Sequence, residues 1–387
     1  MNYSKPTILV LGGGIGGVYT ARELARKIGN EDGVVRADIL VFEREKQSLY
    51  SPSLTWLMVG KRKPYDVTRD MKDIANNGIE VIEGEIEHID PAAKTVTSGG
   101  KVYQGNYMII SLGVEQDQTG NSLSAGHNFY SVDGATSFFD QLKSFEGNRI
   151  TILVKSLPYK SPVAPYESAM LIDNYLREEN RRDDVEISIY TPEDKPMPFA
   201  DKNIIARVTE LMNVKNIRYY PNHQFVREED GKLILKKDGD TSVTVDPGLL
   251  AFTPKHTAPQ ILAEAGLTGA SGWVEPDAAT LETKFENVYA IGDVIDIPID
   301  ATHSLPKAGI FARHQAEVVA HNIMRKIADK APDKTFGFKG SYILDQGDKA
   351  DKISGDFSPD AGQSNYSGVL RHWEKVLSEK MWFLNNF

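Results

Sequence analysis

The chain has 387 residues, too many for one ordinary hydrophobic core, so two or three domains are expected. Hydrophobic residues at 41% and charged residues at 25% exclude a disordered or fibrous protein. The 54 acidic residues outnumber 44 lysines and arginines, and the formal charge of −10 argues against nucleic acid as a main partner. The sequence has no cysteine, which excludes disulfides, iron–sulfur clusters, thiol nucleophiles and a cysteinyl link to a cofactor. No metal site is predicted.

The N-terminus leads directly into an apolar strand, without the basic and apolar regions of a signal peptide. The longest apolar runs, such as Tyr107–Ile110, are far shorter than the roughly 20 residues that span a bilayer. We therefore expect a cytoplasmic protein, at most peripheral on a membrane surface.

The first elements predict a nucleotide-binding unit. A buried strand at 7–11 precedes a glycine turn, a helix at 18–28 and a second buried strand at 38–42. Gly12, Gly14 and Gly17 form G-x-G-x-x-G, and Glu43 ends the second strand. This order is typical of a dinucleotide site, in which the glycines admit a pyrophosphate and the acid accepts from ribose hydroxyls. Further strands are predicted at 80–82, 95–97 and 107–111, and Gly113 after the last is assigned to the same cofactor site.

A second unit begins near residue 148. Strands are predicted at 149–154 and 185–190, with helices at 168–177 and 202–213 and hairpins around 230 and 239. The turn after its first strand, 154–167, has no glycine and three prolines. Proline lacks the N–H donor that a pyrophosphate needs, so NADH is disfavoured as reductant.

The chain then returns to the first unit. Thr283, Ala290, Gly292 and Asp293 form T-x₆-A-x-G-D before a long helix at 308–328. This pattern resembles that of FAD enzymes with two nucleotide-binding domains. The resemblance implies that Asp293 accepts from the ribityl chain and that nearby amides face the pyrophosphate, with FAD bound non-covalently.

Two further segments are more specific. The stretch P-Y-K-S-P-V-A-P-Y-E at 158–167 and the stretch L-P-K-A-G at 305–309 resemble those of sulfide:quinone oxidoreductases and flavocytochrome c sulfide dehydrogenases. Gly340-Ser341-Tyr342 and Tyr50-Ser51-Pro52 also suit that group. In that family two cysteines form a disulfide that takes up sulfide and passes electrons to FAD. The matching positions here are Ser161 and Ser341, either in a natural member of the group or in an engineered Cys-to-Ser form. A hydroxyl has no accessible redox couple, so sulfide activity is expected to be lost or altered.

The resemblance assigns other roles. Lys307, with the helix that follows it, would stabilise the reduced flavin; the alternative is a solvated surface lysine. Glu167 is either an acid or base beside the flavin or an acid favoured by a helix N-terminus. His303 lines the same cavity or is structural.

The last stretch, 369–387, is an amphipathic helical pattern with interfacial tryptophans. It is either a membrane-surface or quinone-pocket element, or a terminal helix docked on its own core or across a dimer. The expected partners are a quinone or another small-molecule electron acceptor, a membrane surface and a second copy of the chain.

Together these features predict an α/β fold with two Rossmann-like dinucleotide-binding domains. The FAD domain is discontinuous, at 1–115 and 250–330, with the second domain at 116–249 and a C-terminal flavin-covering or membrane-surface segment at 331–387. The leading hypothesis is an FAD-dependent oxidoreductase of the sulfide:quinone oxidoreductase type. The alternatives are a type II NADH:quinone dehydrogenase and a non-catalytic flavin-bound interaction protein.

Overall fold

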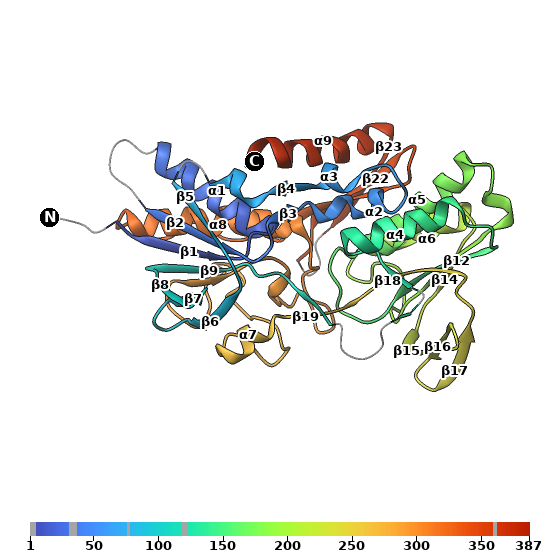
Figure 1. Cartoon of the computed structure of the whole chain (residues 1–387), viewed down its shortest axis with the longest axis horizontal. Coiled ribbons are helices and arrows are strands. Elements are labelled where there is room, and N and C mark those ends of the chain that lie inside the picture. The colour runs from blue at the N-terminus through green and yellow to red at the C-terminus, as the bar shows by residue number, and fades with distance from the viewer. Residues whose placement is uncertain (1–4, 31–36, 76–77, 118–122, 125, 359–361) are drawn as a thin grey trace.

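The structure is a computed structural model that describes residues 5–30, 37–75, 78–117, 123–124, 126–358 and 362–387. Two parallel sheets lie side by side, each with helices packed against it (Figure 1). This confirms the predicted fold class of two nucleotide-binding folds.

The first sheet is built from five parallel strands in the order β20-β9-β1-β2-β5. The central strand is buried on both faces, with Val10 opposite Val41 and Ile109, as continuous apolar runs require. The helices α1 and α8 pack together against this sheet. The elements are β1 (Thr7–Leu11), α1 (Ile15–Asn30), β2 (Asp38–Glu43), β5 (Ile79–Glu83), β9 (Tyr107–Ile110), β20 (Val288–Ala290) and α8 (Gly309–Ile327).

The second sheet also has five parallel strands, in the order β11-β18-β12-β13-β14. It reaches Thr253, whereas the sequence places the end of this domain at residue 249; the domain boundaries themselves stay a prediction. Its elements are β11 (Gly126–Asn128), α4 (Val132–Lys143), β12 (Arg149–Val154), α5 (Ala164–Glu178), β13 (Glu186–Tyr190), α6 (Lys202–Val214), β14 (Ile217–Tyr220) and β18 (Leu249–Thr253).

Small antiparallel sheets and short helices fill the edges. The sheets comprise β3 (Gln47–Leu49) with β4 (Thr68–Asp70), β6 (Ile86–Asp90) with β7 (Thr95–Ser98) and β8 (Lys101–Gln104), β10 (Glu115–Asp117) with β19 (Lys255–Thr257), and β15 (His223–Glu229) with β16 (Lys232–Lys237) and β17 (Thr241–Val245). The short helices are α2 (Leu54–Leu57), α3 (Pro64–Val67) and α7 (Gln260–Glu264), with 3₁₀ turns at Ser51–Ser53, Met71–Ile74, Arg182–Asp184 and Gly292–Val294.

The C-terminal segment is a three-stranded antiparallel sheet followed by a helix. Its elements are β21 (Lys339–Asp345), β22 (Ala350–Asp356), β23 (Gln363–Gly368) and α9 (Val369–Asn386). The sequence predicts the helix but not this sheet, whose strands are rich in Gly, Ser and Asp. Helix α9 lies along one side of the molecule, from the α1 region to the level of α5 (Figure 1).

Candidate functional site

The glycine loop between β1 and α1 has one open position between two crowded ones. A side chain on Gly17 would place its Cβ 1.8 Å from the carbonyl oxygen of Gly12. Gly12 itself has φ +101°, and its Cβ would lie 2.4 Å from the Ser111 carbonyl oxygen. A Cβ on Gly14, by contrast, would meet nothing within 4 Å. Gly12 and Gly17 therefore close the turn, while Gly14 leaves space for a ligand.

A long groove runs past this loop, made of two adjoining hollows of about 400 Å³ and 260 Å³ that share Gly12 and Glu43. Glu43 lies where β2 ends, and its carboxylate accepts from the backbone N–H of Gly13 at 2.6 Å and of Glu45 at 2.9 Å. The larger hollow continues to Pro259 and Gln260. An acid at this place fits the ribose hydroxyls of a dinucleotide.

The other end of the groove carries a carboxylate with one buried oxygen. Asp293 lines it, and among the described residues its Oδ1 has no hydrogen-bond partner. Burial raises the pKa of Asp293, and the charges of Lys160 and Lys307 oppose that shift. A buried acceptor without a donor is costly unless a ligand supplies one.

Backbone groups complete this end. Gly292 adopts φ +79°, and its N–H donates to Gln315 Oε1 at 2.8 Å. Gly113, at φ +66°, faces open space, and helix α8 begins at Gly309, which lines the same hollow. One groove is thus lined by Gly12, Gly14, Gly113, Gly292 and Asp293. The open position at Gly14, the acids Glu43 and Asp293 at its two ends, and the Asp293 oxygen without a donor fit an FAD.

The turn from β12 to α5 supplies Lys160 and Ser161 to the groove. Ser161 has φ +53°, and its N–H donates to the carbonyl of Lys307 at 2.7 Å. Nothing in the sequence pattern singled out Lys160, because a lysine beside a motif position is chemically ordinary. Helix α5 already begins at Ala164, so the prolines expected to extend the turn lie partly in the first helical turn, where proline is tolerated.

Ser341 lies on β21, opposite Ser354 of β22, and is not among the residues that line the groove. Its neighbour Tyr342 is buried, with a hydroxyl that has no partner in the described part of the chain. Burial raises the pKa of Tyr342, and Asp293 adds to that shift. The structure therefore brings Ser161 to the groove and leaves Ser341 outside it.

Lys307 is buried, and its ammonium group is already engaged. Its Nζ donates to the carbonyls of Asp293 and Ile295, both at 2.9 Å, and lies 3.4 Å from the ring centroid of Trp273. Burial lowers the pKa of Lys307 to about 8. The side chain lines a separate hollow of about 390 Å³, which His303 also lines.

Glu167 lies in the first turn of α5 but outside the groove lining. Its carboxylate accepts from the Thr55 hydroxyl, the Lys375 ammonium and, at 3.1 Å, the N–H of Asp345. Burial raises the pKa of Glu167, and Lys375 is the main opposing charge. The acid thus joins α5 to α9.

A second buried acid, Glu193, follows β13 and was not singled out from the sequence. Its carboxylate accepts from the hydroxyls of Tyr166, of Tyr159 at 3.0 Å and of Thr191 at 3.0 Å. Burial raises the pKa of Glu193 to about 7. This acid lies three residues beyond the end of the second strand of its βαβ unit, whereas Glu43 is the last residue of the second strand in the first unit.

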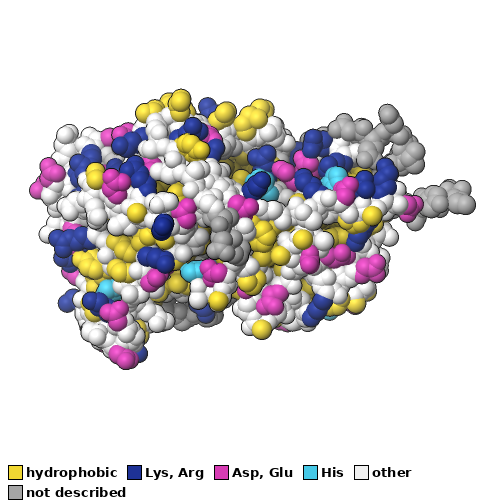
Figure 2. Space-filling view, turned by 180° about the vertical axis from the view of Figure 1, so that it is seen from behind, with side chains coloured by type: hydrophobic (Ala, Val, Ile, Leu, Met, Phe, Trp, Pro, Cys, Tyr) yellow, Lys and Arg dark blue, Asp and Glu magenta, His cyan; other side chains and the backbone are white. Residues whose placement is uncertain are grey.

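Helix α9 buries two charged side chains together with Trp382 and Phe383, and exposes several other apolar side chains. Lys375 and Glu379 are buried, whereas Leu370, Trp373 and Leu377 are 77%, 60% and 58% exposed. Hydrophobic side chains gather along the corresponding edge of the molecule (Figure 2). No helix in the described part of the chain is both long and apolar enough to cross a membrane.

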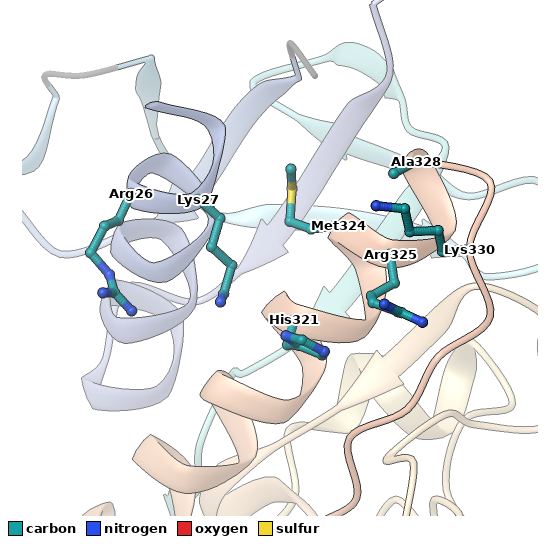
Figure 3. A pocket seen from close by; sticks show the side chains of 7 residues that line it. All are labelled: Arg26, Lys27, His321, Met324, Arg325, Ala328 and Lys330. Carbon is teal, nitrogen blue, oxygen red and sulfur yellow. The ribbon is translucent and has the colours of Figure 1, made fainter. Parts of the chain in front are cut away.

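A further hollow of about 300 Å³ lies between α1 and α8, away from the glycine loop (Figure 3). Its basic side chains are largely paired within the protein. Asp333 contacts His321 at 2.6 Å and Arg325 at 3.2 Å, and Glu23 contacts Arg26 at 2.7 Å. This hollow shares no lining residue with the dinucleotide groove.

Comparison with known proteins agrees with this geometry. The mitochondrial sulfide:quinone oxidoreductase of Mus musculus is 25% identical over 309 residues, which cover 76% of this chain and 67% of that protein. A type II NADH:quinone oxidoreductase of Staphylococcus aureus is 19% identical over 84% of this chain and 83% of its own length. The crystal structure of the Aquifex aeolicus sulfide:quinone oxidoreductase superposes with a TM-score of 0.88 at 23% identity, over 99% of this chain and 92% of that one, and shows the shared fold.

The family model of pyridine nucleotide-disulphide oxidoreductases matches residues 6–153 and 173–316. The unmatched residues between these ranges include the proline turn, where the sequence departs from a nucleotide-binding glycine loop. The chain belongs to the pyridine nucleotide-disulphide oxidoreductase family, as an FAD-dependent oxidoreductase similar to the sulfide:quinone oxidoreductases.

Proposed function

We propose that this chain holds FAD non-covalently in the groove and passes electrons from a donor to a quinone at a membrane surface. The observation that carries the proposal is the groove itself, where the open Gly14 position and Asp293 face one hollow, and where Asp293 Oδ1 has no hydrogen-bond partner among the residues that the structure describes. When bound, FAD supplies two-electron chemistry that no side chain of this cysteine-free sequence can supply.

The chain's own residues would orient that group. Glu43 would accept from ribose hydroxyls and Asp293 from the ribityl chain, while the N-termini of α1 and α8 offer N–H donors to negative charge. Lys307 would act as a positioning residue, because its Nζ holds the carbonyls of Asp293 and Ile295. Ser161 would shape the wall of the groove without accepting electrons.

The donor side differs from that of the named relatives. Without cysteine, the chain cannot form the disulfide that takes up sulfide, so direct sulfide oxidation should be lost or slow. NADH is also disfavoured. Glu193, which lies just beyond the strand end where a second dinucleotide site would present its ribose acid, accepts hydrogen bonds from the hydroxyls of Tyr159 and Tyr166. The name of the Staphylococcus relative keeps NADH as the second candidate, which saturable reduction of the flavin by NADH would support.

The membrane surface is proposed from α9. Its exposed stripe of Leu370, Trp373, Leu377, Met381 and Leu384 follows helical spacing and faces away from the protein. A quinone is itself apolar and dissolves in lipid. An acceptor site that opens at a lipid surface would therefore shorten the path of the quinone from the membrane to the protein.

The experiment uses the purified full-length protein under anaerobic conditions. We expect a flavin spectrum, no saturable reduction by sulfide or NADH, and rapid reoxidation of chemically reduced protein by a short-chain benzoquinone. Protein without flavin would overturn the cofactor assignment. Reoxidation by dioxygen but not by quinone would overturn the acceptor assignment, and inertness toward every acceptor would favour the non-catalytic interaction protein.

A further inference from the structure

At the proline-turn end of the groove, one lysine has no hydrogen-bond or ion-pair partner among the described residues. Lys160 lines the hollow beside Ser161 and Asp293. Among the described residues its ammonium makes no hydrogen bond and no ion pair within 4.0 Å. Lys307, the other nearby lysine, is held by two carbonyls and the face of Trp273.

A second basic side chain near Lys160 carries no charge. His256, on β19, is buried with neither ring nitrogen bonded in the described part of the chain. Burial lowers the pKa of His256 to about 3, and the charges of Lys160 and Lys307 contribute to that shift. The imidazole therefore stays neutral and leaves the two lysines as the local cations.

The counter-charge beside Lys160 is Asp293. Burial lowers the pKa of Lys160 and the charge of Asp293 opposes that shift, while burial raises the pKa of Asp293. Helix α8 begins at Gly309 on the same hollow and adds the positive end of its dipole. Negative charge that develops in this hollow would thus meet an unneutralised ammonium in a poorly solvated place.

We propose that Lys160 stabilises the negative charge that reduction places on the bound FAD, and so raises its reduction potential. The inference rests on the proposed function. Two electrons from the donor enter with one proton, so the bound group becomes one unit more negative, and a nearby cation binds that form more tightly. The structure thereby gives to Lys160 the charge-stabilising role that the sequence suggests for Lys307.

The alternative role of the same side chain is that of a counter-ion for Asp293 only. The two roles differ in what they change. A cation that acts on the reduced group alters the ratio of the affinities for reduced and oxidised FAD, and this ratio sets the midpoint potential of the bound group. A counter-ion of Asp293 alters the affinity for both forms equally.

The test compares the full-length protein with K160M, K160R and K202M, where Lys202 is an exposed lysine at the start of α6. The dissociation constant of oxidised FAD and the midpoint potential are measured for each variant, with dithionite and a reference dye under excess FAD. For K160M we expect about a tenfold loss in the preference for the reduced form, or about 30 mV for a two-electron couple. K160R and K202M should stay within about threefold of the unmodified protein.

An unshifted potential in K160M with bound FAD would overturn the inference alone, whether or not the affinity for oxidised FAD falls. A shift of the same size in K202M would also overturn it, since the effect would then come from net charge. Absence of FAD from the unmodified chain would instead overturn the proposed function, and the inference with it.

Discussion

At the scale of single residues, the glycine loop separates two roles that a sequence motif presents as one. Gly17 is required by the fold because its missing side chain lets the Gly12 carbonyl approach, whereas Gly14 faces open space. Folding and cofactor binding should therefore respond to different glycines.

Alanine substitutions test this separation. We expect Gly17→Ala to lower the free energy of unfolding of the cofactor-free protein by about 1–3 kcal/mol, because the new methyl group overlaps the Gly12 oxygen. Gly14→Ala should change that free energy by less than about 0.5 kcal/mol yet reduce the ratio of bound FAD to protein. Denaturant titration and absorbance measure the two quantities. Equal FAD content in both variants would contradict the assignment.

Glu193 should make stability depend on pH. Its pKa rises from 4.5 to about 7 on folding, so between these values the folded protein holds a proton that the unfolded chain has lost. The free energy of unfolding is therefore highest below pH 4.5. It falls as the pH rises toward 7, by up to about 1.4 kcal/mol per pH unit. We expect Glu193→Gln to remove that slope. Parallel unfolding free energies for the two proteins from pH 5 to 7 would contradict it.

At the scale of elements, α9 is joined to the body by polar contacts. The Lys375–Glu167 pair is buried, and Glu379 accepts from Ser53 at 2.6 Å and pairs with Arg62 at 2.8 Å. Apolar contacts add to these, since Trp382 stacks on Tyr50.

A double-mutant cycle measures the buried pair. Lys375→Met should cost about 3–5 kcal/mol because it leaves Glu167 buried without its cation. Glu167→Gln in the same chain should restore most of that loss, since no charge is then left unpaired. Lys380→Met, an exposed change on the same helix, is the control. If the two losses simply add, the pair does not hold the helix in place. That result would favour the alternative role of Glu167 as an acid or base beside the flavin.

The exposed face of α9 predicts binding to lipid. Replacing Leu377 by serine should weaken binding to phospholipid vesicles about tenfold, because burying a leucine contributes about 1.5–3 kcal/mol. The melting temperature should not change, because the side chain is exposed. Asn385→Ser on the same helix serves as control. Flotation that is equal for both variants would favour the alternative that α9 docks against a second copy.

At the scale of the whole molecule, the groove joins distant parts of the chain. Its lining includes Gly14, Ser111, Ser161, Asp293 and Gly309, which come from the first sheet, the second unit and α8. A ligand in the groove therefore contacts elements that are otherwise joined through loops.

Cofactor removal should accordingly loosen the whole molecule. At a free FAD concentration one hundred times its dissociation constant, binding adds about 2.7 kcal/mol to the free energy of unfolding. We expect the apoprotein to melt earlier and to be cut faster by a protease, and FAD to reverse both changes. FMN, which lacks the adenosine half, should do so poorly. Identical melting of apoprotein and FAD-loaded protein would contradict the assignment of the groove.

The residues that the sequence assigns to the cofactor site from local patterns lie along the groove, and their binding role stays a prediction. Gly12, Gly14, Glu43 and Asp293 lie at strand ends, where one turn determines the geometry. Contacts between distant segments could not be predicted, because local patterns do not show which segments meet. An example is the contact of Lys375 with Glu167, 208 residues apart. Sheet β21-β22-β23 was also missed, because its polar strands lack the alternation that marks a half-buried strand.

The polar contacts that join α9 to the body have one more consequence. Most amphipathic segments that bind membranes order only on contact, and that ordering reduces their affinity. Here Lys375, Glu379 and Asn386 already hold the helix in place through contacts with the protein. The loss of conformational entropy on ordering the helix thus occurs during folding and not during binding. We therefore expect α9 within the protein to bind lipid more tightly, and to associate faster, than the same segment as a free peptide.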